Sequence, residues 1–211
     1  MDVDFTQLTA YQRYKLMASL IVPRPIALVT TVGPTGVVNA APFSMFNMVG
    51  EDPPLVMVSV NRAHAGGRMK DTAANILRSG EFVVHLPDEA IAEQMHACGD
   101  TLGPEQSEVE YTGLTLRPSR TLAVPTLAEA PVAFECVLHE KLVNESRYVF
   151  FGRINALHAR DGLIDTELWR VRLQDYFPVG RFGASFYLRS RDRFAMEGAK
   201  GTGRHTAIDE I

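Results

Sequence analysis

Apolar strand patterns separated by short turns recur along this chain, and they limit its possible folds more than any other feature. The β-branched run Ile26 to Val32 stops at Gly33-Pro34-Thr35-Gly36, which is typical of a turn, and an extended pattern resumes over Val37 to Ala41. Pro54 to Val60 predicts another strand. We expect the first two strands to form a hairpin.

The second half of the chain predicts longer strands joined by short turns. Val132 to Leu138 alternates well, and Tyr148 to Ile154 follows it, which indicates a hairpin. We expect that strand pattern to run on to a hairpin turn at Asp161-Gly162. Val179 to Leu188 predicts a final strand.

Two helices interrupt these strands. Asp71 to Arg78 has helical spacing and is followed by Ser79-Gly80, a common helix end, after which Glu81 to Leu86 predicts a strand. A second helix is expected from Pro87 to about Ala97. The segment Cys98 to Tyr111 has little periodicity, and we expect a loop that covers a site.

This order of elements favours a mainly β fold, an antiparallel barrel with helical insertions. A doubly wound sheet would need regular alternation of strands and helices, which the second half lacks. With 211 residues, of which 46% are hydrophobic, we expect one domain over residues 1–190. The polar residues 191–211 are expected to form a mobile tail or an arm on a partner subunit.

Composition excludes several classes of protein. The net charge of −4 has no long single-sign block behind it, so nucleic-acid binding is not expected. No apolar run approaches the length of a membrane span, and a cytoplasmic protein is the expectation. Cys98 and Cys136 lie far apart, which argues against a disulfide scaffold or a thiolate metal cluster, and both are expected to be buried thiols.

The familiar catalytic and nucleotide motifs are missing from the sequence. GxGxxG after the first strand, GxxxxGK[ST], HExxH and GxSxG do not occur. We expect no metal site, and we interpret His85, in a predicted strand, as a structural residue.

A possible anion site remains at the start of the first internal helix. A helix start exposes N–H groups and the positive end of the helix dipole, and Lys70 and Thr72 would add a charge and a hydroxyl donor. These donors suit a phosphate monoester. The alternative is that Asp71 or Thr72 simply caps the helix while Lys70 is solvated.

Hydroxyl and amide side chains also gather where strands end. Ser44 and Asn47 follow one predicted strand, and Ser59 and Asn61 end the next. They would suit a polyol chain or the edge of a heterocycle, although turn chemistry explains them equally well. Thr30-Thr31 taken alone indicates sheet propensity.

Taken together, these segments resemble the flavin reductase-like, FMN-binding split-barrel family, especially its flavoredoxin-type branch. The resemblance covers roughly residues 15 to 190. Its elements are Arg24-Pro25-Ile26-Ala27-Leu28-Val29-Thr30-Thr31, Asn39-Ala40-Ala41-Pro42-Phe43-Ser44-Met45-Phe46-Asn47, Lys70-Asp71-Thr72 with Asn75-Ile76, Gly80-Glu81-Phe82-Val83-Val84, Tyr111-Thr112-Gly113-Leu114-Thr115, Ala130-Pro131-Val132 and Val179-Gly180-Arg181-Phe182-Gly183.

The resemblance implies an antiparallel split β-barrel that forms a homodimer, with FMN held noncovalently near the subunit interface. It assigns the phosphate to Lys70, Asp71 and Thr72, helped by Ser59 and Arg62. It assigns the isoalloxazine ring to Thr30, Thr31, Ala41, Pro42, Phe43 and Ser44. Asn47 would support that wall or the ribityl chain, and Asn61 and Arg181 are further candidates for cofactor binding.

The implied activity is an FMN-dependent NAD(P)H oxidoreductase, either a flavin reductase or a flavoredoxin-like electron carrier. Hydride would pass from the nicotinamide to flavin N5 without a protein nucleophile, and His158 is a candidate near the nicotinamide. A non-catalytic FMN-binding or storage protein and a barrel for another phosphorylated ligand are the alternatives. No pattern distinguishes NADH from NADPH or identifies the final acceptor, for which a monooxygenase partner is one expectation.

Overall fold

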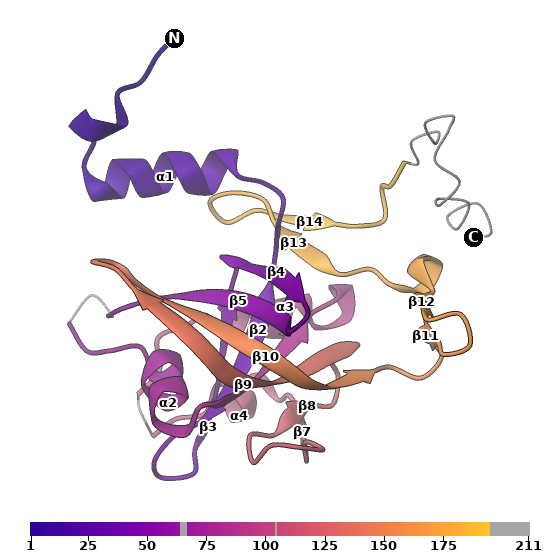
Figure 1. Ribbon diagram of the computed structural model, residues 1–211. Helices are drawn as coiled ribbons and strands as arrows, with labels where there is room; N and C mark the ends of the chain where they lie inside the picture. The colour runs from indigo at the N-terminus through magenta and orange to yellow at the C-terminus, as the bar shows by residue number, and fades with distance from the viewer. Residues whose placement is uncertain (64–66, 104, 195–211) are drawn as a thin grey trace.

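A single seven-stranded antiparallel sheet organises the molecule (Figure 1). The computed structural model describes residues 1–63, 67–103 and 105–194. The strand order is β3-β2-β6-β9-β10-β5-β4. The strands are β2 (Ala27–Val32), β3 (Val38–Phe43), β4 (Phe46–Glu51), β5 (Pro54–Asn61), β6 (Glu81–Leu86), β9 (Val132–Val143) and β10 (Arg147–Ala159).

The sheet curls without closing, because its two outermost strands, β3 and β4, are not neighbours in the strand order. This is a split barrel, and it confirms the predicted mainly β fold. Its main core includes Ile76, Phe82 and Phe150, all fully buried. Packing there is so close that a Cβ added to Gly152 would lie 2.4 Å from the Phe82 ring, which explains the glycine in the middle of β10.

The described residues contain four α-helices. They are α1 (Ala10–Leu20), α2 (Asp71–Ser79), α3 (Ala92–Ala97) and α4 (Glu108–Thr112), with 3₁₀ turns η1 (Phe5–Gln7), η2 (Glu89–Ile91) and η3 (Leu173–Asp175). The end of α2 follows the prediction, since Gly80 adopts the left-handed conformation at φ 72°. No helix in the described residues is long and apolar enough to cross a membrane.

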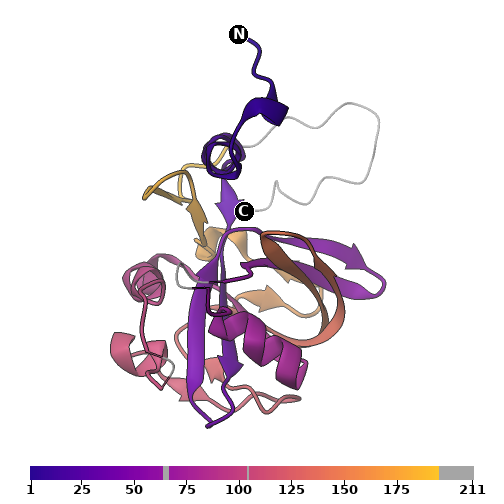
Figure 2. The same ribbon diagram turned by 90° about the vertical axis from the view of Figure 1, so that its left-hand side faces the viewer.

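Three small sheets complete the architecture. They are β1 (Arg24–Pro25) with β13 (Val179–Arg181) and β14 (Tyr187–Arg189), β7 (Leu116–Arg117) with β8 (Thr126–Leu127), and β11 (Ile164–Asp165) with β12 (Arg170–Val171). Figure 2 shows that α1 projects beyond the barrel, on the side of β13 and β14. α1 buries none of its residues.

Several sequence predictions need correction. The expected single strand Val179 to Leu188 is a hairpin of β13 and β14, because the chain reverses between them at Ala184, which has φ 45°. The Asp161-Gly162 turn forms, but the strand after it pairs with β12 and not back with β10. The expected loop Cys98 to Tyr111 contains most of α4, and β4 was not predicted.

The carboxyl-terminal tail is described only in part. Arg191 stacks on Phe177 and forms an ion pair with Glu89, so the chain at this position packs against the domain. The remaining residues of the predicted tail, 195–211, lie outside the described residues. The division into a domain over 1–190 and a tail remains a prediction.

His85 is a structural residue, as its sequence context predicted. It is fully buried in β6, where its Nδ1 lies 2.9 Å from the carbonyl oxygen of Leu28 and the backbone N–H of Leu127 donates to its Nε2 at 2.9 Å. These partners require a neutral ring with its proton on Nδ1. Burial lowers the pKa of His85 from its ordinary value of 6.5 to about 4.

This burial predicts a specific loss of stability in acid. Because the pKa of His85 is lower in the folded protein, the unfolded chain takes up the proton first as the pH falls, so the free energy of unfolding should decline between about pH 6.5 and about pH 4. The expected contribution is on the order of 3 kcal/mol. Urea unfolding at a series of pH values measures it.

His85→Gln is the matched variant, because an amide can replace both hydrogen bonds but does not titrate. It should be less stable than the wild type near neutral pH and lose less free energy across the acid range. An equal loss in both proteins would show that His85 does not contribute to the acid sensitivity.

Candidate functional site

The helix α2 begins after an N-cap residue, Lys70, whose own side chain does not cap it. Asp71 accepts a hydrogen bond from Arg68, and the Thr72 hydroxyl accepts one from Asn39 at 3.1 Å. Neither Asp71 nor Thr72 is the N-cap residue, since that position is held by Lys70. The N–H groups at the positive end of a helix favour an anion.

A cavity of about 70 Å³ lies at this helix start and joins two of the predicted segments. One wall comes from β3 and the start of α2, and the other from the segment between α3 and α4. The lining residues are Asn39, Ala41, Phe43, Lys70, Asp71, Thr72, Cys98, Gly99, Asp100, Leu102 and Glu108. Five predicted site residues, namely Ala41, Phe43, Lys70, Asp71 and Thr72, thus meet in one place.

The charges around this cavity are mixed. Lys70 is the cation in the lining, and Asp71, Asp100 and Glu108 are the carboxylates. Burial raises the pKa of Glu108, and Asp71 is paired with Arg68. The positive contribution therefore comes from Lys70 together with the positive end of the α2 dipole.

Glu108 also seals one edge of the open sheet. The backbone N–H of Ala40, in the outermost strand β3, donates to Glu108 Oε2 at 3.0 Å, and the Ser107 hydroxyl donates to the carbonyl oxygen of Val38 at 2.6 Å. Two backbone groups that would otherwise be open to another strand are thereby satisfied. The sequence offered no local signal for this role, because Glu108 and Ala40 are far apart along the chain.

Two buried amides, Asn39 and Asn75, were missed as site residues. The Asn75 amide donates to the Thr31 hydroxyl at 3.0 Å, just as the Asn39 amide donates to Thr72. Asn75 follows Thr72 by three residues, so both face the sheet from one side of α2. That spacing was the available signal. These bonds hold the helix start against β2 and β3.

Thr30 and Thr31 lie in the interior and line neither of the two cavities described here. Both are fully buried in β2. Thr30 donates its hydroxyl hydrogen to the carbonyl oxygen of Pro125 at 2.8 Å, and Thr31 is occupied by Asn75. In this chain their hydroxyls position a loop and a helix.

The other predicted site residues on β3, on β4 and between these strands do not lie together in one place. The Ser44 hydroxyl accepts a hydrogen bond from Arg24 at 3.3 Å. Pro42 comes close to Gly99, because a Cβ on that glycine would lie 3.5 Å from the proline ring. Asn47 lines the second cavity.

The remaining predicted residues lie elsewhere, and none lines either cavity. Ser59 is buried in β5, and Asn61 is the exposed last residue of that strand. Arg62 packs over the ring of Tyr148. Arg181 donates to the hydroxyl of Tyr187 at 2.6 Å. His158 lies in β10, and burial lowers its pKa.

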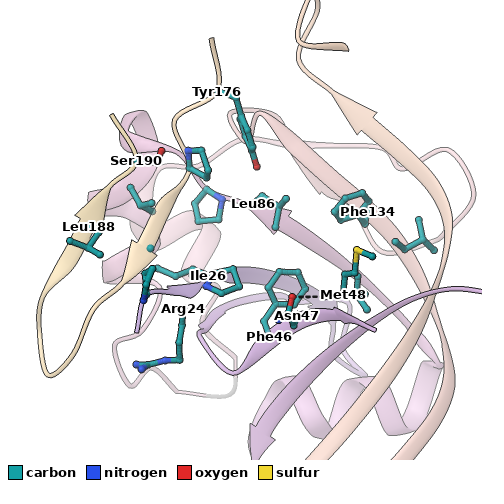
Figure 3. A pocket seen from close by; sticks show the side chains of 18 of the residues that line it. Arg24, Ile26, Phe46, Asn47, Met48, Leu86, Phe134, Tyr176, Leu188 and Ser190 are labelled. Carbon is teal, nitrogen blue, oxygen red and sulfur yellow. Dashed lines mark hydrogen bonds between the residues drawn. The ribbon is translucent and has the colours of Figure 1, made fainter. Parts of the chain in front are cut away.

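The second cavity is much larger, about 800 Å³, and lies at one end of the barrel (Figure 3). Phe46, Leu86, Phe134 and Ile154 belong to the barrel interior and form part of its wall. β1, β13 and β14 contribute the facing wall, through residues that include Gly180 and Leu188.

The sequence as a whole matches the model of the flavin reductase like domain over residues 17–175. The chain belongs to the flavin reductase like family. YwrF, a protein of Bacillus subtilis (strain 168), is 38% identical over 196 residues, which are 90% of this chain and 95% of YwrF.

Solved structures of this family agree with the fold. The Pseudomonas fluorescens 2-nitrobenzoate 2-nitroreductase NbaA is 40% identical, with a TM-score of 0.87 over 95% of this chain and 97% of its own. Nitrilotriacetate monooxygenase component B from Bacillus cereus is 33% identical, with a TM-score of 0.86 over 93% and 98% of the two chains. Membership of the flavin reductase like family makes this chain an oxidoreductase that binds a flavin.

The seal on β3 can be tested by mutation. Glu108→Ala leaves the buried Ala40 N–H without its partner and should lower the free energy of unfolding by about 1–3 kcal/mol. Glu108→Gln, whose amide oxygen still accepts, should lose less. Glu110→Ala is the control, since Glu110 is exposed on the same short helix, and its effect should stay within about 0.5 kcal/mol. Equal effects at the two positions in urea unfolding would remove the role given to Glu108.

Proposed function

We propose that this protein is an FMN-dependent NAD(P)H oxidoreductase, with the phosphate of FMN bound at the start of α2. The observation that supports this most strongly is that the amino end of α2 meets Lys70 and Thr72 in one cavity of a flavin reductase like fold. Backbone N–H groups, a hydroxyl and an ammonium are the donors that a phosphate monoester requires.

The size of the cavity limits what this chain holds by itself. A volume of about 70 Å³ suits a phosphate-sized group and does not enclose a flavin ring. The ring would therefore extend from the cavity along Ala41 and Phe43, which line it on β3. In this proposal Lys70 neutralises the phosphate, and Asn39 and Asn75 keep the helix start in place.

Bound FMN would supply the hydride acceptor, at its N5 atom. The chain's own contribution would be to bind and orient, because the work of positioning two reactants needs no protein nucleophile. The described residues contain no group of three metal-ligating side chains, and both cysteines are buried with raised pKa values.

A homodimer is part of the proposal. α1 exposes Tyr11, Met17 and Leu20, the last with 73% of its surface accessible, and the outer strand β4 exposes Met48 and Val49. Exposed apolar helices and open strand edges of this kind are usually covered by a partner. A second subunit would also help to enclose a flavin ring that the small cavity leaves uncovered.

The electron acceptor is proposed from the relatives. Component B of a monooxygenase suggests delivery of reduced flavin to a partner oxygenase, and the nitroreductase NbaA suggests direct reduction of an organic acceptor. A flavoredoxin-like electron carrier is the third form of the same proposal. A cytoplasmic location is part of the same proposal, since NAD(P)H as donor would favour it.

Lys70→Ala should weaken FMN binding by about 1–3 kcal/mol, the range for loss of a charge-assisted hydrogen bond. Fluorescence titration of FMN into the apoprotein measures the dissociation constant. Lys70→Arg should restore most of the affinity. Lys141→Ala removes the same charge from the exposed β9–β10 hairpin and should bind FMN like the wild type.

Unchanged affinity in Lys70→Ala would move the phosphate away from α2. If mass spectrometry found another phosphorylated compound released on denaturation, and FMN titration gave no binding, the flavin proposal itself would fail.

Catalysis is tested separately from binding. Anaerobic addition of NADH or NADPH to the FMN-loaded protein should bleach the flavin absorption at a rate well above that of free FMN under the same conditions. A protein that binds FMN but is reduced by neither nucleotide would be a storage or binding protein, and the enzymatic proposal would be wrong.

A further inference from the structure

The hairpin of β11 and β12 presents the only tryptophan of the chain to solvent. Trp169 is 80% exposed, and its backbone has φ 52°, in the left-handed region that favours glycine. The Asp165 carboxylate fixes this turn, because its Oδ1 accepts the backbone N–H groups of Glu167 and Leu168, both at 3.0 Å. A firmly held, strained backbone that exposes a large apolar side chain indicates a binding role. Figure 1 shows the hairpin at one side of the molecule, away from α1.

The surface around Trp169 is apolar and positively charged. All six residues from 168 to 173 are exposed, and we call them the Trp169 surface: Leu168, Trp169, Arg170, Val171, Arg172 and Leu173. Neither arginine forms an ion pair within the described part of the chain. Asp165 is the register partner of Arg170, but its carboxylate is engaged by the turn. A partner for this surface therefore needs apolar side chains together with carboxylates.

The apolar part of the Trp169 surface is small. Its exposed area is on the order of 400 Å², about half of the roughly 800 Å² that each partner contributes to a stable protein interface. Exposed patches of this size on single proteins are often functional. The area suits a short peptide segment better than a second folded protein.

The chain returns to this hairpin near the end of the described residues. Arg193 donates to the carbonyl oxygen of Leu173 at 2.6 Å and packs over the ring of Phe177. Residues 195–211 follow, outside the described residues, and the sequence at positions 208–211 is Ile-Asp-Glu-Ile. This short stretch combines two apolar side chains with two carboxylates, which is the chemistry that the Trp169 surface requires.

The length of chain after Arg193 is sufficient for contact. The stretch from position 194 to position 208 can span up to about 50 Å, whereas Leu173 and Trp169 are at most about 14 Å apart along the hairpin. A segment tethered in this way has an effective concentration in the millimolar range, so a contact with a dissociation constant of about 1 mM would be half occupied.

We propose that residues 208–211 bind to the Trp169 surface of their own chain. The two isoleucines would pack against the Trp169 indole and Leu168. Asp209 and Glu210 would pair with the two arginines of the surface. The contact does not rest on the proposed function, because no residue of the Trp169 surface lines either cavity.

Fluorescence of Trp169 tests the contact directly, because no other tryptophan contributes to the signal. Acrylamide quenching of the full-length protein is compared with quenching of a variant that lacks residues 206–211. We expect the deletion to raise the quenching constant about two-fold, as for a site that is at least half occupied. NaCl at about 1 M should raise quenching of the full-length protein and leave the deletion variant unchanged, because salt screens exposed ion pairs and acrylamide is uncharged.

Charge-neutral variants keep the chain length constant. Asp209→Asn combined with Glu210→Gln should raise quenching toward the value of the deletion variant, and Glu197→Gln is its control at another acid of the same stretch. Arg170→Gln combined with Arg172→Gln should have the same effect from the hairpin side. Lys141→Gln, on the exposed β9–β10 hairpin, should change nothing. Far-UV circular dichroism checks folding, and the variants at positions 209 and 210 keep the test available if the arginine variant unfolds.

Three results would overturn the proposal. Equal quenching of the full-length protein and the deletion variant would show that residues 206–211 do not cover Trp169. Protection that increases with protein concentration would show that a second copy covers the surface. Protection that is insensitive to both salt and the charge-neutral variants would remove the pairing with the arginines.

Discussion

Two amide–hydroxyl hydrogen bonds between α2 and the sheet determine the geometry of the candidate site. Asn39 bonds to Thr72, Asn75 bonds to Thr31, and Thr31 and Asn39 are themselves register partners in β2 and β3. All four side chains are buried, so each lost bond would leave an unsatisfied polar group in the interior. The helix start is thus fixed relative to β3, and Lys70 with it.

The two edge strands of the open sheet, β3 and β4, differ in how their free edges are covered. At β3, Ser107 and Glu108 occupy the backbone groups of the edge, and the same Glu108 lines the small cavity. At β4, the other edge strand, Met48 and Val49 are exposed. One edge is therefore closed from within the chain and beside the candidate phosphate site, while the other remains suited to a contact between subunits.

The sequence predicted correctly those elements whose structure depends on neighbouring residues in the chain. The strand Glu81 to Leu86 was predicted with its observed bounds, and Gly80 marked the end of α2 because only glycine readily takes the left-handed conformation there. The hairpin of β13 and β14 was missed, since its reversal occurs at a non-glycine residue, Ala184. Standard turn patterns contain no signal for such a position.

The site was predictable in part for the same reason. Lys70 and Thr72 could be placed from helix periodicity and meet Ala41 as the resemblance implied, but the partners of Glu108 and Asn39 depend on tertiary contacts between distant segments. Thr30 and Thr31 show the limit most clearly. A hydroxyl in a strand is read equally well as a ligand contact or as an internal hydrogen-bonding group, and only the structure shows that Thr30 donates to Pro125 and that Thr31 accepts from Asn75.

The separation of the two cavities bears on how such a fold can diversify. The polar anchor lies between β3 and α2, held by buried hydrogen bonds that tolerate little change. The large cavity is bounded partly by β13, β14 and the segment after them, which pack on the barrel end through partly exposed side chains. Substitutions in that covering layer would alter the shape of the cavity without disturbing the anchor. The two cavities share no lining residue in this chain, so residues at the barrel end can change while the contacts at the start of α2 stay the same.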